Sequence, residues 1–126
     1  MELTEKERLL LVGKKEEIRK LTEDIIELTT DIQRNRTEIK KRVEGILSAI
    51  SIIASYTNSN LDMQAFAVTA QVIFHHMDIE PLLPKTITTE LEIFCNIVNS
   101  MKFNFTEKGL RVNIEKIDFS LLRAGK

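Results

Sequence analysis

Few residues of this 126-residue chain have the types and the spacing that chemistry requires. His75 and His76 are adjacent, and neighbouring residues of a helix point about 100° apart, so their imidazoles do not converge on one metal ion. Cys95, the single cysteine, follows Phe94 in an apolar helical stripe, which predicts a buried and unreactive thiol. The sequence has no phosphate-binding glycine loop and no Ser, His and Asp arrangement typical of nucleophilic catalysis. We therefore expect a protein that is not an enzyme and has no catalytic, cofactor-binding or metal-binding residues.

One charged segment departs from an otherwise balanced sequence with a net charge of −1. Five basic residues lie within nine positions and are opposed only by Glu38. Such a segment is usually a solvated helix face, but an acidic partner or a phosphate would also bind there. No aromatic residue lies among the five, so stacking on nucleic-acid bases is not expected. This basic band consists of Arg34, Arg36, Lys40, Lys41 and Arg42.

The N-terminal half of the chain must position the basic band, and its apolar residues recur every seven residues. Thr4-Glu5-Lys6-Glu7 has the form of a capping box and marks the start of a helix. Heptad spacing of apolar residues is typical of a coiled coil. The seam of this predicted coiled coil consists of Leu11, Ile18, Leu21, Ile25, Leu28, Ile32, Ile39, Val43, Ile46, Ile50 and Ile53.

The heptad spacing of the seam is interrupted at the basic band. Asn35 and Arg42 occupy positions where the heptad pattern requires apolar residues, which indicates a stutter in one continuous helix from about Thr4 to about Thr57. The alternative is an αα-hairpin that turns at Gln33–Arg36. No glycine or proline marks a turn there, so the pattern favours the continuous helix. Its apolar stripe would stay exposed on a single chain, which predicts a homo-oligomer, with a dimer favoured over a trimer.

The rest of the chain predicts two shorter helices followed by a β-hairpin. The polar segment Thr57–Asn60 ends the first helix, and Leu61–Met77 carries almost no charge, as expected of a buried helix. A helical stripe of apolar residues follows between Ile87 and Met101. Apolar and polar residues then alternate on both sides of Glu107-Lys108-Gly109, which predicts a hairpin with a three-residue loop. Gly109 is the residue expected to need a positive φ.

The fold class expected is therefore mostly α with a small β part (α+β). Residues 1–57 are predicted to be a coiled-coil oligomerisation helix, and residues 58–126 a small head of two helices and the hairpin. The lone cysteine fits a reducing compartment, and the longest apolar run is far short of the ~20 residues that a membrane-spanning helix needs. We expect a cytoplasmic protein with no membrane partner.

The function expected from this architecture is that of a non-enzymatic, homo-oligomeric interaction protein, such as an adaptor, scaffold or inhibitor, with another protein as a further partner. Two alternatives stay open. A nucleic-acid-associated protein would use the band Arg34–Arg42, although nucleic acid is not the favoured partner. A small-ligand-binding or sequestering protein would hold its ligand in a pocket between the helices of the head.

Overall fold

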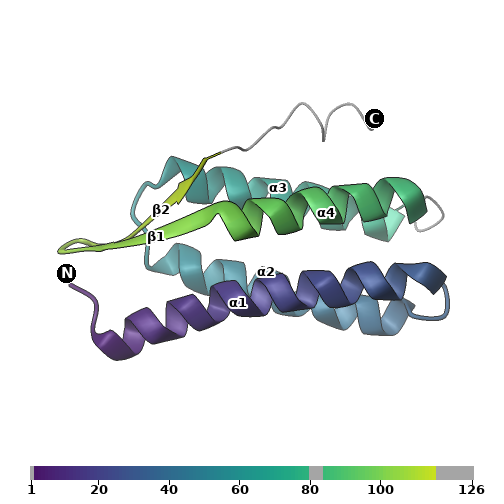
Figure 1. Ribbon diagram of the computed structural model, residues 1–126, viewed down its shortest axis with the longest axis horizontal. Helices are drawn as coiled ribbons and strands as arrows, with labels where there is room; N and C mark the ends of the chain where they lie inside the picture. The colour runs from purple at the N-terminus through teal and green to yellow at the C-terminus, as the bar shows by residue number, and fades with distance from the viewer. Residues whose placement is uncertain (1, 80–83, 116–126) are drawn as a thin grey trace.

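The computed structural model describes residues 2–79 and 84–115, which form two layers of helices and a β-hairpin (Figure 1). This arrangement confirms the predicted fold class, mostly helical with a hairpin at the C-terminal end of the described chain. In Figure 1, α1 and α2 lie in one layer and α3 and α4 in the other. The elements are α1 (Glu5–Leu28), the 3₁₀ helix η1 (Thr29–Asp31), α2 (Arg36–Ser55), α3 (Leu61–Ile79), α4 (Pro84–Ser100), β1 (Met101–Thr106) and β2 (Gly109–Ile114).

The N-terminal half is an αα-hairpin, so the prediction of one continuous helix from Thr4 to Thr57 is wrong. The turn needs no glycine or proline because polar side chains satisfy the backbone groups that it frees. The Asn35 side-chain amide donates to the Leu28 carbonyl oxygen at 3.1 Å, and Asp31 Oδ1 accepts from the Arg34 backbone N–H at 3.1 Å. The apolar stripe can then be buried by antiparallel packing within one chain, without a second copy.

The start of α1 is as the sequence predicted. Thr4 Oγ1 accepts a hydrogen bond from the Glu7 backbone N–H at 3.1 Å, and Glu7 Oε1 accepts one from the Thr4 backbone N–H at 3.0 Å. The two bonds complete a capping box. They also hold the pKa of Glu7 below its ordinary value, because the charged carboxylate is the better acceptor.

All residues of the predicted seam contribute to the core of this single chain. From the sequence, the chain was divided between residues 57 and 58, in the loop between α2 and α3. A single hydrophobic cluster joins residues from both sides of this loop. Heptad spacing therefore marks the buried faces of α1 and α2, and these faces pack on α3 and α4 within the chain. The seam residues Leu11, Ile18, Ile25, Ile39, Ile46, Ile50 and Ile53 are buried, and Leu21, Leu28, Ile32 and Val43 are partly buried against them.

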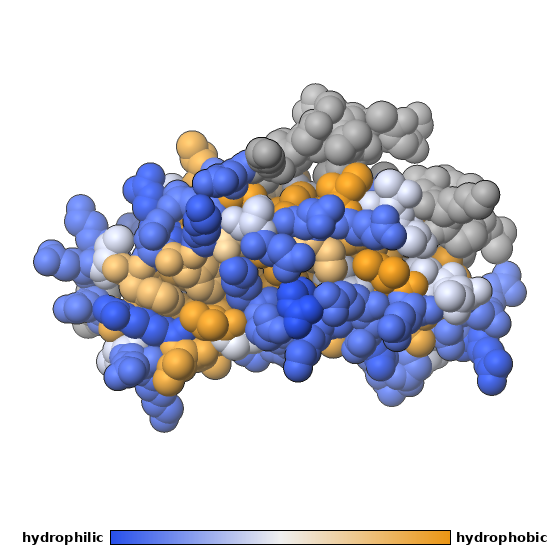
Figure 2. Space-filling model, viewed as in Figure 1, coloured by the Kyte–Doolittle hydropathy of each residue, from blue (hydrophilic) through white to orange (hydrophobic). Residues whose placement is uncertain are grey.

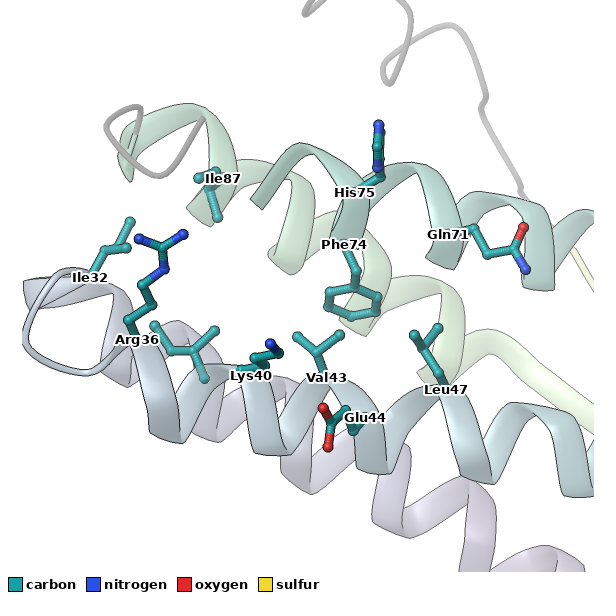
Figure 3. A pocket seen from close by; sticks show the side chains of 11 residues that line it. Ile32, Arg36, Lys40, Val43, Glu44, Leu47, Gln71, Phe74, His75 and Ile87 are labelled. Carbon is teal, nitrogen blue, oxygen red and sulfur yellow. The ribbon is translucent and has the colours of Figure 1, made fainter. Parts of the chain in front are cut away.

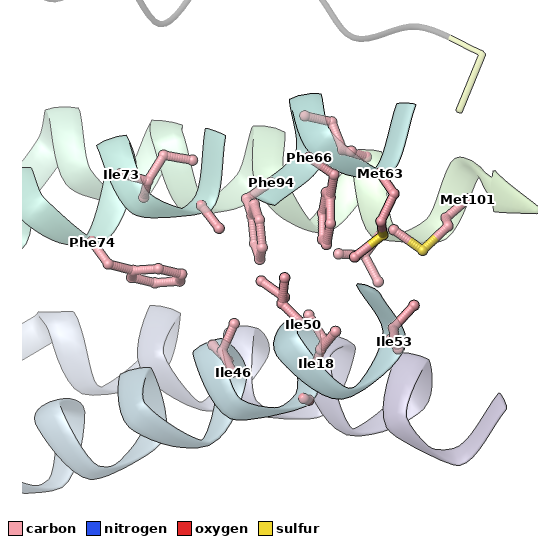
Figure 4. Packing of buried hydrophobic residues seen from close by; sticks show 14 of the residues in the cluster. Ile18, Ile46, Ile50, Ile53, Met63, Phe66, Ile73, Phe74, Phe94 and Met101 are labelled. Carbon is pink, nitrogen blue, oxygen red and sulfur yellow. The ribbon is translucent and has the colours of Figure 1, made fainter. Parts of the chain in front are cut away.

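Aromatic rings fill the space between the two layers (Figure 4). The Phe94 ring stacks on the Phe66 ring, with centroids 5.1 Å apart and ring planes 9° from parallel. Phe74 meets Phe94 edge to face, with centroids 5.6 Å apart. Phe94 of α4 thus joins two rings of α3, and Figure 4 shows these rings above Ile46 and Ile50 of α2. Burial of such large rings is a major source of stability.

The β-hairpin pairs β1 and β2 antiparallel, from Met101 opposite Ile114 to Thr106 opposite Gly109. Its loop therefore has two residues, Glu107 and Lys108, and the predicted three-residue loop is one residue too long. Gly109 begins β2 with a φ of 124°, which confirms the prediction that it needs a positive φ.

Hydrogen bonds from α1, from α3 and from Asn60 just before α3 hold the β-hairpin in place. Asn60 Oδ1 accepts from the Val112 backbone N–H at 2.6 Å, and Asp62 Oδ2 accepts from the Ile114 backbone N–H at 2.8 Å. The ammonium of Lys15 donates to the Met101 carbonyl oxygen at 2.6 Å. An isolated two-stranded hairpin is marginally stable, and these contacts supply the partner that it needs.

A candidate binding pocket between α2 and α3

The structure separates the four residues of the basic band that belong to α2 into two groups on different faces of the helix. Lys41 and Arg42 belong to the first group, and both pair with acidic residues. The Arg42 guanidinium lies 2.9 Å from Glu38 and 3.6 Å from Asp24 of α1, and the Lys41 ammonium lies 3.9 Å from Glu38. The hydrogen bond from Arg42 holds the pKa of Glu38 below its ordinary value. Because these charges are already paired within the chain, they are less available to a partner. Arg34 is exposed in the turn before α2.

Arg36 and Lys40 form the second group and lie one helical turn apart, in line with Val43 and Leu47. Both cationic side chains are exposed, and within residues 2–79 and 84–115 neither makes an ion pair. Arg36 is the first residue of α2, where the helix dipole favours a negative charge. Helix stability therefore does not explain a cation at this position. Arg36 and Lys40 therefore lie on the same face of α2 as the apolar residues Val43 and Leu47.

A pocket with a volume of about 370 Å³ lies beside these residues, between α2 and α3 (Figure 3). This volume falls within the range of about 300–1,000 Å³ that is usual for small-molecule sites. In Figure 3 the Arg36 guanidinium lies between Ile32 and Ile87, and Val43 and Phe74 face each other farther along the helices. We call it the α2–α3 pocket; it is lined by Ile32, Arg36, Ile39, Lys40, Val43, Glu44, Leu47, Gln71, Phe74, His75 and Ile87.

The interior of the α2–α3 pocket is apolar, whereas its charged and polar groups lie at the edge. Ile39, Phe74 and Ile87 are buried. Gln71 and His75 of α3 are exposed, and Figure 3 shows His75 pointing away from the other lining residues. A ligand with an apolar body and one anionic group would satisfy both parts of this surface.

The pocket forms on this side of α2 because α2 packs more closely on α1 than on α3. Gly45 contributes to that difference, since a Cβ at this position would lie only 3.0 Å from Leu21 Cδ1. Glycine thus lets the two helices approach each other. On the opposite side of α2, Val43 and Leu47 do not fill the space that α3 leaves.

Two other surfaces of the described chain are hollowed or apolar. A polar hollow of about 840 Å³ lies between the α2–α3 loop and the hairpin, but its Asn60 and Asp62 already bind the backbone of β2. Apolar side chains also gather near the N-terminal end of α1 and the hairpin (Figure 2). The exposed apolar residues of α1 are Leu9, Leu10 and Val12.

The residues considered for chemistry at the outset do not form a reactive site in the described part of the chain. Cys95 is buried, as predicted, and burial raises the pKa of its thiol, which disfavours the nucleophilic thiolate. His75 lies at the edge of the α2–α3 pocket, and the side chain of His76 is outside the part described. Among the described residues, no group of three or more His, Cys, Asp or Glu is placed to hold a metal ion.

Among the lining residues of the pocket, the sequence singled out binding or seam residues on α2 but none on α3. Arg36, Lys40 and Val43 were singled out by charge or by heptad position, whereas Gln71 and Phe74 were not. The pocket of the small-ligand alternative was expected between the head helices α3 and α4, but the α2–α3 pocket joins a head helix to the N-terminal hairpin. The available signal was the alignment of Arg36, Lys40, Val43 and Leu47 on one face of a helix.

Neither a protein-family model nor a curated protein nor a solved structure matches this chain. In the part of the chain that is described, no helix combines the length and the apolar character needed to cross a membrane.

Proposed function

We propose that the protein is a non-enzymatic binding protein that holds an amphipathic anion in the α2–α3 pocket. One observation carries this proposal. Arg36 and Lys40, which make no ion pair within the described residues, border an apolar pocket of about 370 Å³. Apolar surface next to unpaired cations favours a ligand that buries a hydrophobic body and places a negative group at the edge.

The other functions expected from the sequence receive less support. The heptad residues that suggested a coiled coil are buried or partly buried within one chain, so their spacing does not require a second copy. A nucleic acid would need a continuous basic surface, but Lys41 and Arg42 pair with Glu38. An adaptor or scaffold role would still be consistent with the pocket if its ligand were part of another protein.

The first test uses anilinonaphthalene sulfonate, a fluorescent amphipathic anion. We expect the folded protein to bind it at one site, and the double substitution Arg36→Gln with Lys40→Gln to weaken binding about tenfold or more. Each substitution removes a charge-assisted hydrogen bond to the sulfonate. Fluorescence titration at constant salt concentration measures the change.

The matched control is Arg34→Gln with Lys41→Gln, which makes the same change in net charge at basic residues that do not line the pocket. Its affinity for the dye should equal that of the wild type. The dye also binds partly unfolded chains, so each variant must first show a cooperative unfolding transition. Equal losses in the two folded variants would mean that the dye responds to overall charge, and the proposal would fail.

A further inference from the structure

The α2–α3 pocket carries its positive charge at one end only. Arg36 and Lys40 lie toward the start of α2, and Figure 3 shows the Arg36 guanidinium beside Ile32 and Ile87. Farther along α2, the charged residue of the lining is the acidic Glu44. A second anionic group on the ligand would lie near this carboxylate and be repelled by it. The charges therefore fit a ligand with one anionic head.

The pocket is long, and its interior offers little for polar groups to bind. Arg36 and Leu47 are eleven residues apart, which corresponds to about 17 Å along the axis of α2 at 1.5 Å per residue. Between them the interior is formed by Ile39, Val43 and Phe74, whose side chains have no hydrogen-bonding group. A sugar or nucleoside would lose its hydrogen bonds to water in this space without replacing them.

The side chains of the interior also fit a flexible hydrocarbon chain better than a planar ring, which can enter the pocket but contacts fewer of its walls. Phe74 is the one aromatic residue of the lining, and its ring already meets Phe94 in the core. The remaining apolar walls are branched aliphatic side chains, among them Ile39, Val43 and Leu47. A flexible hydrocarbon chain can follow such a surface and bury each of its methylene groups.

We infer that the ligand is a fatty carboxylate whose head binds Arg36 and Lys40 and whose chain lies between Val43, Leu47 and Phe74. This inference rests on the proposed function and specifies its ligand. The planar fork of an arginine matches the two oxygens of a carboxylate, and the lysine ammonium adds a second donor.

The experiment measures displacement of anilinonaphthalene sulfonate from the full chain by octanoate, decanoate and dodecanoate, each below its micelle concentration. The affinity is expected to rise about fourfold for each added methylene until the chain fills the pocket. Dodecyltrimethylammonium has the same chain with a cationic head and should not displace the dye. The Arg36→Gln, Lys40→Gln variant should lose the preference for dodecanoate over the cationic analogue.

A second variant tests the position of the chain. Leu47 lies at the far end of the pocket from Arg36 and is 36% exposed, so Leu47→Trp should fold and shorten the space for the chain. We expect this substitution to lower the affinity for dodecanoate more than the affinity for octanoate. The control Leu61→Trp is at an exposed position on α3 outside the pocket and should leave both affinities unchanged.

Three results would overturn the inference: equal displacement by the carboxylate and the cationic analogue, no dependence on chain length, or competition by an acidic helical peptide but by none of the carboxylates. If the dye binds at Arg36 and Lys40 but no carboxylate displaces it, the fatty carboxylate is wrong and the proposed function stands. If the dye does not bind the folded protein, both are wrong.

Discussion

Ile25→Asp is expected to abolish cooperative folding of the chain. Ile25 is fully buried in α1 and belongs to the core that all four helices share. An aspartate there would be an unpaired charge without water, which costs several kcal/mol. That loss is comparable with the whole stability of about 5–15 kcal/mol that is usual for a domain. Far-UV circular dichroism during urea titration should show no cooperative transition.

Leu9→Asp is the matched control, because it places the same charge on the same helix at a side chain that is 68% exposed. It should change the free energy of unfolding by no more than about 0.5 kcal/mol. The two variants also separate the αα-hairpin from the coiled coil. If Ile25→Asp gave a folded chain of lower oligomeric state, Ile25 would lie in a seam between copies and the intramolecular packing described above would be wrong.

Phe94→Ala is expected to lower the free energy of unfolding by about 3–5 kcal/mol. The Phe94 ring is fully buried and contacts the rings of both Phe66 and Phe74. Its removal would leave a cavity between the two helical layers and end both ring contacts. Chemical denaturation with urea measures the loss, provided that transitions followed by different probes coincide and that the two proteins have the same slope.

Phe105→Ala is the comparison for this substitution. From the sequence, the same loss of about 3–5 kcal/mol was expected if the Phe105 ring lay in the core. The ring is only partly buried in the structure, with the Arg8 guanidinium 5.3 Å from its centroid. We therefore expect a smaller loss than for Phe94→Ala. Equal losses would mean that the Phe105 ring contributes as much to the core as the Phe94 ring, which would contradict its partial burial.

Helices and strands in which apolar residues recur at a regular spacing were predictable from the sequence. Whether the chain turns back between two helices was not. The Thr4–Glu7 capping box and the alternation after Met101 report local geometry, and the structure contains both. Heptad spacing shows that one face of a helix is buried, but antiparallel packing within a chain and pairing between chains use the same spacing. The turn at Gln33–Arg36 was weighed as the alternative but not favoured, because side-chain hydrogen bonds, rather than glycine or proline, allow the helix to end.

The candidate site was predictable only in the part that one helix provides. The charge of Arg36 and Lys40 was visible in the sequence, but the position of Arg36 at the start of α2 was not, because one continuous helix was predicted there. Lys41 and Arg42 differ from these two residues in pairing with Glu38 of the same helix, and Arg42 also lies near Asp24, which α1 brings to that face of α2. The opposite wall, Phe74 included, comes from α3, and its position follows from tertiary packing that no local pattern encodes.

The most direct test of the proposed function is to locate the bound anion by NMR. With Ile, Leu and Val methyl groups labelled, anilinonaphthalene sulfonate should give intermolecular nuclear Overhauser effects to Ile39, Val43 and Leu47 of the α2–α3 pocket. The exposed methyl groups of Leu9 and Val68 lie outside it and should give none. Contacts to Leu9 and Val68, with none to Val43 and Leu47, would show that the anion binds exposed apolar surface and would contradict binding in the α2–α3 pocket.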